Sequence, residues 1–133
     1  MSRDVLFVYG TLLPGAADAM GRAERARLAR ESTRLGTARA CGVLYDLGAY
    51  PVLVAGAGPV GLVRGEAVRL LDPVSSLGWL DLYEGIGERP GEYRREQIDI
   101  VTGDGRSLRA WAYLSVSARP AGRVIASGSW LER

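Results

Sequence analysis

The chain has 133 residues, of which 47% are hydrophobic, so it is long enough to form one domain with a substantial core. Its formal net charge is +2, all of the positive charge comes from arginine, and neither histidine nor lysine is present. This composition excludes a Ser-His-Asp or Cys-His site, a zinc site built on histidine, and a lysine Schiff base. Acid–base chemistry is left to carboxylates, tyrosines or a bound ion.

The charge pattern and the apolar runs also limit the partners. No apolar run is long enough to span a membrane, and the N-terminus lacks the features of a signal peptide, so we expect a cytoplasmic protein. The densest basic segment, Arg22 to Arg34, contains Glu24 and Glu31, which favours a solvated helix face over a nucleic-acid surface. The lone Cys41 forms no internal disulfide and is expected to be a small core residue.

The first element is expected to be a strand that leads into a binding loop. Val5 to Val8 is a continuous apolar run, which predicts a strand covered on both faces. Tyr9 to Leu12 breaks that pattern, and Gly10 can adopt backbone angles closed to other residues and allow close approach of a ligand. Successive N–H groups in such a turn can hold a carbonyl oxygen or a carboxylate. The alternative is an ordinary turn at the end of a strand.

The middle of the chain predicts one helix and a curved sheet. Helix-forming residues predict a helix over Ala16 to Ser32, with Met20, Ala23 and Leu28 as its apolar stripe. Strands are then expected over Leu35 to Tyr45, with a bulge at Gly36 or Gly42, over Val52 to Val54, and over Val60 to Leu71. Glycines inside the last strand suit a tightly curved sheet or a small barrel.

The second half predicts a capped helix, a hairpin and an anchored tail. Asp72 as N-cap and Pro73 begin a helix over Val74 to Glu84, which Gly85 and Gly87 end. The remaining elements are strands over Tyr93 to Val101 and Ser107 to Ser115, the hairpin turn Thr102 to Gly105, and a loop-like tail from Arg119 to Arg133 held by Trp130. We expect an α+β fold in a single domain, residues 1–133.

The predicted helix carries a carboxylate on its apolar side. Leu77, Leu80 and Glu84 share one stripe, with Val74 and Asp81 on its flank. Burial raises the pKa of an unpaired carboxyl toward neutrality, which suits a general acid–base. Alternatively, Glu84 binds an arginine or returns to water at the helix end. Asp81 is expected to bond backbone groups in a structural role.

Several motifs together resemble the gamma-glutamylcyclotransferase-like family, especially its gamma-glutamylamine cyclotransferase branch. They are, in order, Tyr9-Gly10-Thr11-Leu12, the segment Gly42 to Pro51, Val63-Arg64-Gly65-Glu66, Leu80 to Gly85 followed by Tyr93-Arg94-Arg95, and Gly128-Ser129-Trp130. The likeness covers nearly the whole chain and is weakest over Pro14 to Ser32, so substrate identity is the point that it leaves open.

The resemblance implies a small, partly open β-barrel with flanking helices and a cavity at one end. It implies that Tyr9, Gly10, Thr11 and Leu12 bind the substrate through backbone N–H groups, and that Glu84 is the catalytic acid–base. The implied reaction closes a gamma-glutamyl group into 5-oxoproline and releases a free amine, with no cofactor and no metal. Tyr113 is expected either to line the cavity or to pack in the core.

Two other functions remain open at this point. One is a related acyltransferase or deacylase that removes gamma-glutamyl groups from a biosynthetic intermediate. The other is a module that binds a small acidic metabolite without turnover. The sequence predicts a small-molecule partner, and it leaves the oligomeric state and the leaving amine undefined.

Overall fold

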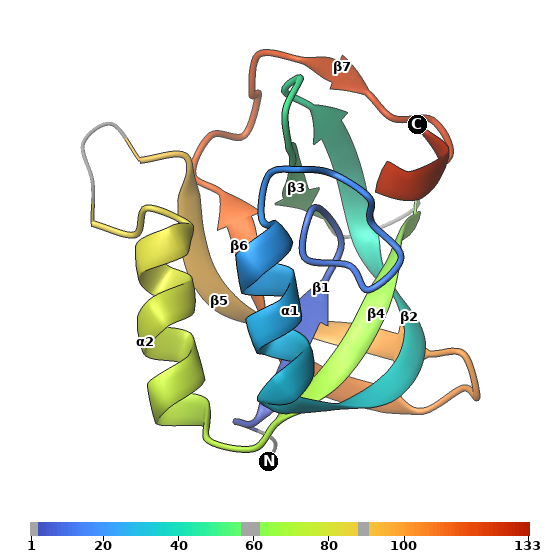
Figure 1. The fold of residues 1–133 in the computed structure, drawn as a ribbon. Coiled ribbons are helices and arrows are strands. Elements are labelled where there is room, and N and C mark those ends of the chain that lie inside the picture. The colour runs from blue at the N-terminus through green and yellow to red at the C-terminus, as the bar shows by residue number, and fades with distance from the viewer. Residues whose placement is uncertain (1–2, 57–61, 88–90) are drawn as a thin grey trace.

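The computed structural model describes residues 3–56, 62–87 and 91–133. The elements in chain order are β1 (Val5–Val8), α1 (Arg22–Arg30), β2 (Ser32–Asp46), β3 (Pro51–Ala55), β4 (Leu62–Leu70), α2 (Pro73–Tyr83), β5 (Tyr93–Thr102), β6 (Ser107–Ser115), β7 (Arg123–Val124) and the short 3-10 helix η1 (Trp130–Glu132). Figure 1 shows the strands wrapped around one another, with α1 and α2 on the outside.

The strands form a barrel, which confirms the α+β fold with flanking helices. Their order is β1-β4-β2-β3-β6-β5, and further pairings of β1 with β6 and of β2 with β5 close the sheet on itself. Strand β6 is parallel to both β1 and β3, through the single pairs Leu6 with Trp111 and Leu53 with Leu114. Because only one residue pair joins β6 to each of these two strands, the barrel is held together by few backbone contacts there, in keeping with the partly open barrel that the resemblance implied.

The side chain of Tyr9 spans the place where β6 changes partner. Its hydroxyl donates a hydrogen bond to the carbonyl of Tyr113 and accepts one of 3.3 Å from the N–H of Leu53. Tyr113 lies on β6 between Trp111, which pairs with β1, and Leu114, which pairs with Leu53 of β3. Tyr9 thus joins the end of β1 to both strands and fixes the start of the following loop.

Glycines allow the tight curvature, as the sequence predicted. The register between β2 and β4 shifts between Arg34 and Gly36, and Gly36 has φ +121°, so the expected bulge lies there and not at Gly42. A Cβ on Gly65 would lie 2.1 Å from the carbonyl oxygen of Val8. Only glycine therefore lets β4 pass so close to β1.

Helix α1 is shorter than predicted. It begins at Arg22, because Gly21 adopts φ +78° as its N-cap and the preceding residues form turns. Met20 is 43% exposed, and Leu28 is the buried residue of α1, so the expected stripe is reduced to one side chain. Ser32 belongs to β2 instead.

Helix α2 agrees with its predicted signals at both ends. The Asp72 carboxylate accepts the N–H of Ser75 at 3.3 Å, and the chain leaves the helix through Gly85 at φ +73°. Leu77 and Leu80 are buried as expected. Val74 is 86% exposed, so its placement on the flank of the buried stripe was wrong: it stands in the first turn, before the helix reaches the core.

Two further residues test the predicted core. Cys41 is exposed, which corrects its assignment to the core, because strand alternation points it outward between the buried Ala40 and Gly42. Trp130 is fully buried, with its indole N–H 3.3 Å from an Asp18 carboxylate oxygen, so it anchors the tail as predicted. Residues 57–61, which include the expected start of β4, lie outside the described residues. Within the described ranges, no helix has the length and hydropathy needed to cross a bilayer.

Candidate active site

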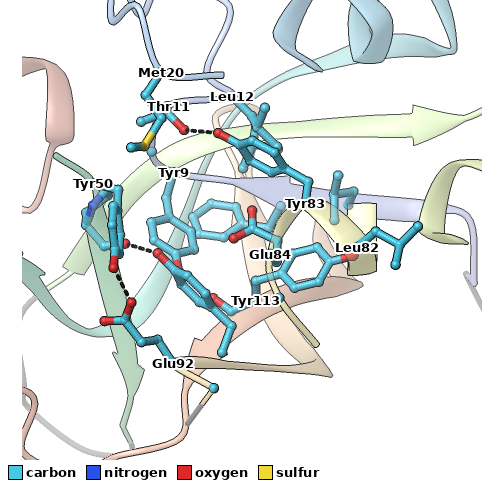
Figure 2. A pocket seen from close by; sticks show the side chains of 18 residues that line it. Tyr9, Thr11, Leu12, Met20, Tyr50, Leu82, Tyr83, Glu84, Glu92 and Tyr113 are labelled. Atoms are coloured by element: carbon cyan, nitrogen blue, oxygen red, sulfur yellow. Dashed lines mark hydrogen bonds between the residues drawn. The ribbon is translucent and has the colours of Figure 1, made fainter. Parts of the chain in front are cut away.

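A cavity of about 350 Å³ opens beside the end of β1. The loop after β1, the end of α2, the turn before β3 and the start of β5 meet there, with Tyr113 of β6 at its wall (Figure 2). Its lining residues come from segments that are far apart in the sequence: Leu6, Phe7, Val8, Tyr9, Gly10, Thr11, Leu12, Met20, Tyr50, Pro51, Leu82, Tyr83, Glu84, Gly85, Gly91, Glu92, Tyr93 and Tyr113. The cavity brings Glu84 and all four predicted loop residues together.

Glu84 follows the last turn of α2 and enters the cavity. The buried Leu77 and Leu80 hold this stripe of the helix against the core, which carries Glu84 inward with them. Its carboxyl group makes no hydrogen bond or ion pair with any described residue, so the alternative of an arginine partner does not describe its position.

The environment of Glu84 favours its protonated form. The residue keeps partial access to solvent through the cavity, yet protein atoms surround its carboxyl group, and this burial raises its pKa to about 8. Loss of hydration penalises the charged form, and no described cation offsets the penalty. The carboxyl group can therefore both accept and release a proton near neutral pH.

Asp81, one turn earlier, is held very differently. The Arg95 guanidinium donates two hydrogen bonds to its carboxylate, at 2.8 and 3.2 Å, and the Tyr113 hydroxyl donates a third at 2.7 Å. The expectation that Asp81 bonds backbone groups was wrong, because β5 and β6 bring these two side chains to it. Its structural role is supported, since its charge is neutralised by an arginine.

The loop after β1 lines the cavity and holds backbone donors that have no partner in the described structure. Within the described part of the chain, the N–H groups of Gly10, Thr11 and Leu12 have no acceptor. Two of the loop's carbonyls are occupied: that of Gly10 accepts the N–H of Leu13 at 3.0 Å, and that of Thr11 accepts the guanidinium of Arg25. The free donors are therefore available to a ligand.

Gly10 is needed for space and not for its backbone angles. Its φ is not positive, which corrects the reason given from the sequence. A Cβ at this position would lie 2.8 Å from Cγ of Pro51, so the first residue of β3 packs directly against the loop. Next to it, the hydroxyls of Thr11 and Tyr83 lie 3.1 Å apart, which links the loop to the end of α2.

Tyrosines make up much of the wall, a feature that the sequence analysis missed. Five of the six tyrosines line the cavity: Tyr9, Tyr50, Tyr83, Tyr93 and Tyr113. Burial raises the pKa of Tyr9, Tyr93 and Tyr113, and the negative charge of Glu84 raises each further, so these phenols stay protonated. The sequence holds six tyrosines and a single phenylalanine, and this excess was the signal that could have predicted a wall rich in tyrosine. Tyr113 both lines the cavity and packs in the core, so the two alternatives were compatible.

No resident metal site is visible around Glu84. Among residues 3–56, 62–87 and 91–133, no three cysteine or carboxylate side chains lie close enough to hold a metal ion. Hydrogen-bonding chemistry in the cavity rests on one unpaired carboxyl group, several phenols and the loop N–H groups.

Comparisons with known proteins agree with this architecture. Residues 6–132 match the family described as gamma-glutamyl cyclotransferase, AIG2-like. A protein of Vibrio cholerae serotype O1, provisionally named a gamma-glutamylcyclotransferase, is 36% identical over 129 residues, which cover 97% of this chain and 96% of that protein.

Solved structures show the same fold. YkqA from Bacillus subtilis superposes with a TM-score of 0.71 at 25% identity; the match covers 97% of this chain but only 40% of YkqA. An AIG2-like protein of Mus musculus superposes with a TM-score of 0.69 at 20% identity, over 89% of this chain and 80% of that protein. Because the family match and the Vibrio relative both extend over almost every residue, the chain belongs to the gamma-glutamyl cyclotransferase, AIG2-like family.

Proposed function

We propose that this protein is an enzyme that converts a gamma-glutamyl amine or peptide into 5-oxoproline and a free amine. The observation that carries the proposal is the unpaired Glu84 carboxyl group, with its pKa raised to about 8, in the same cavity as the free N–H groups of Gly10, Thr11 and Leu12. A proton carrier and donors for a negative oxygen are the two parts that cyclisation of an amide requires.

The reaction is intramolecular. The α-amine of the gamma-glutamyl group attacks its own γ-carbonyl carbon, a carbon–nitrogen bond forms, and a five-membered ring closes. Glu84 takes a proton from the attacking nitrogen and delivers it to the leaving nitrogen as the original amide bond breaks. The protein's main task is to hold the substrate in a folded pose, because both reacting groups belong to one molecule.

The loop serves the carbonyl oxygen or the α-carboxylate. Backbone N–H groups of Thr11 and its neighbours would donate to the oxygen that becomes negative during attack. The aromatic rings of Tyr9 and Tyr113 line the cavity, and low local hydration would strengthen such hydrogen bonds. The proposed chemistry uses no metal and no covalent enzyme intermediate.

A role in binding alone is disfavoured by Glu84. Burial of this unpaired carboxyl group costs free energy, and a site that only binds an anion does not require it. An acyltransferase or deacylase of gamma-glutamyl groups would use the same carboxyl group and loop. It differs in its product, because only cyclisation yields 5-oxoproline.

The test is to incubate the purified protein with a panel of gamma-glutamyl amines and peptides and to measure 5-oxoproline and the released amine by mass spectrometry. We expect the two products in equal amounts, at a rate that EDTA leaves unchanged. Free glutamate or a transferred gamma-glutamyl group, in place of 5-oxoproline, would support the acyltransferase or deacylase. Loss of the rate on chelation, restored by a divalent cation, would replace the metal-free mechanism.

A further inference from the structure

The guanidinium of Arg25 joins two distant points of the segment between β1 and α1. It donates one hydrogen bond to the Thr11 carbonyl at 2.5 Å and another to the Asp18 carbonyl at 2.8 Å. The chain from Thr11 to Asp18 is therefore closed into a ring by one side chain. Asp18 lies within the stretch Pro14 to Ser32, where the resemblance to the family's motifs is weakest, so no motif predicted this contact.

The closed segment contains turns and no helix or strand. Two turn hydrogen bonds lie in the part that includes the binding loop: the N–H of Leu13 donates to the Gly10 carbonyl at 3.0 Å, and the N–H of Ala16 donates to the Leu13 carbonyl at 2.9 Å. A segment with so little backbone pairing opens easily unless other contacts restrain it. The hydrogen bonds of Arg25 supply such a restraint.

The side chain of Asp18 is held by the C-terminal tail. One carboxylate oxygen accepts the indole N–H of Trp130 at 3.3 Å, and the other lies 3.5 Å from a guanidinium nitrogen of Arg133. The Arg133 guanidinium lies 3.6 Å from the centroid of the Trp130 ring and donates to the Trp130 carbonyl at 2.6 Å. Since Trp130 is fully buried, the carboxylate is attached to a fixed point of the core.

The tail is fixed in turn to the barrel. The N–H of Arg64 on β4 donates to the Gly128 carbonyl at 2.8 Å, and a Cβ on Gly128 would lie 2.0 Å from the Leu62 carbonyl oxygen. A Cβ on Gly15 would lie 3.2 Å from Cδ1 of Leu131, so the tail also touches the segment after β1. Figure 1 shows the tail beside that segment. A continuous series of contacts therefore leads from β4 through the tail to the binding loop.

The series ends at one of the unpaired donors. The Thr11 carbonyl and the Leu12 N–H belong to the same planar peptide unit, so a hydrogen bond that fixes the carbonyl fixes the N–H as well. Asp18 contributes through its own carbonyl, which holds the second nitrogen of the Arg25 guanidinium. A shift of Asp18 would turn the guanidinium and with it this peptide unit.

We infer that Asp18 is a positioning residue of the proposed site. Its side chain is fixed by Trp130, its carbonyl orients Arg25, and Arg25 holds the peptide unit between Thr11 and Leu12. The inference rests on the proposed function for the identity of the ligand. It adds to that function a residue and a tail that do not line the cavity.

Amide hydrogen exchange followed by NMR tests the positioning without any ligand. Asp18→Ala and Trp130→Phe remove the same hydrogen bond from its two partners. Each should speed exchange of the two turn amides described above by about three- to tenfold, the effect of one lost hydrogen bond. Asp4→Ala, which removes an ion pair with Arg69 at the opposite end of β1, is the matched control and should leave these rates unchanged. Amides of β1 and β4 report any general loss of stability.

A double-mutant cycle then tests whether Asp18 acts through Arg25. Calorimetric titration with 5-oxoproline should show about three- to tenfold weaker binding by Asp18→Ala. The double variant of Asp18→Ala with Arg25→Ala should bind no more weakly than Arg25→Ala alone, because both changes release the same peptide unit. Asp18→Asn, which keeps an oxygen acceptor for the Trp130 indole, should restore most of the affinity.

Two results would overturn the role of Asp18. One is additive losses of affinity in the cycle, and the other is exchange of the turn amides that is unchanged, or that speeds up only as much as exchange of the β1 and β4 amides. If the wild-type protein binds no 5-oxoproline, the proposed function fails, and the exchange rates by themselves decide whether Asp18 positions the loop.

Discussion

At the scale of single residues, one carboxylate in the last turn of α2 and one at its C-cap have been given different roles by their neighbours. Asp81 is bound by Arg95 and Tyr113, so its charge is compensated. Glu84 has no such partner among the described residues, and burial raises its pKa to about 8. The same side-chain chemistry is therefore structural at one position and suited to proton transfer three residues later.

Replacement of Glu84 by glutamine should remove turnover and keep the fold. We expect kcat to fall by about 10² or more, the contribution typical of a general acid–base. At pH 5 the melting temperature of Glu84→Gln should be close to that of the wild type, because the buried wild-type carboxyl group is then protonated and nearly isosteric with the amide. Assays of 5-oxoproline formation measure the loss of kcat, and thermal unfolding measures the melting temperature. Near-normal turnover would contradict the role of Glu84.

The pH dependence of the rate should report the raised pKa of Glu84. The base form is ionised, so kcat/KM should rise with pH and level off above about 8, instead of near the ordinary pKa of glutamate. A second ionisation should belong to the α-amine of the substrate and move when the substrate is changed. Profiles measured on two substrates separate these ionisations. A rising limb near pH 4 to 5, roughly the ordinary range of a glutamate, would contradict the assignment.

At the scale of elements, the loop after β1 is held from three sides. Pro51 packs against Gly10, Tyr83 of α2 meets Thr11, and Arg25 of α1 holds the Thr11 carbonyl. Each contact comes from a different segment, and all of them leave the loop N–H groups unused. The rigidity of the proposed donor set is thus a property of the surrounding elements.

Gly10→Val should abolish ligand binding, because a branched side chain would collide with the Pro51 ring. Thr11→Ser should be mild, since it keeps both the backbone N–H and a hydroxyl for Tyr83. Calorimetric titration with 5-oxoproline measures both variants, and Thr11→Ser serves as the control for loop substitution. Normal binding by a folded Gly10→Val protein would refute the loop as the binding element.

Arg25→Ala should weaken ligand binding by roughly tenfold, the effect expected for a lost charged hydrogen bond. The Thr11 carbonyl and the Leu12 N–H share one peptide plane and point in opposite directions, so Arg25 also fixes the direction of that donor. Arg22→Ala, at an exposed position of the same helix, is the matched control. Rescue of Arg25→Ala by added guanidinium ion would indicate positioning, whereas equal losses in both variants would indicate a general effect on α1.

At the scale of the whole molecule, closure of the barrel creates the cavity. Strand β6 passes from β1 to β3, and the Tyr9 hydroxyl bonds the Tyr113 carbonyl on β6 and the Leu53 N–H on β3. Tyr9 and Tyr113 also belong to the wall of the cavity. Barrel stability and site geometry are therefore coupled through Tyr9.

Tyr9→Phe should lower the free energy of unfolding by about 1–3 kcal/mol, because it leaves the Tyr113 carbonyl and the Leu53 N–H without their partner. Tyr45→Phe is the control: its hydroxyl has no hydrogen bond within the described ranges, and the change should be within about 0.5 kcal/mol. Urea unfolding with an unchanged m-value provides the measurement. Equal stabilities of Tyr9→Phe and the wild type would show that this bridge contributes nothing.

The sequence by itself determined the features that depend on neighbours along the chain. The apolar run of β1, the Asp72 cap, the glycine stop after α2 and the stripe that leads to Glu84 are all local patterns, and each agrees with the structure. Local propensity and helical periodicity act over a few residues, so they can be read without knowledge of the fold.

Only the tertiary structure decided which distant groups meet. The Arg95 partner of Asp81, the Pro51 contact of Gly10 and the Tyr50–Glu92 pair each join segments that the barrel brings together. The outward direction of Cys41 depends on the register of β2, and the late start of α1 depends on turns that the loop requires. Such contacts depend on strand pairing over long sequence separations, which no local pattern in a single sequence records.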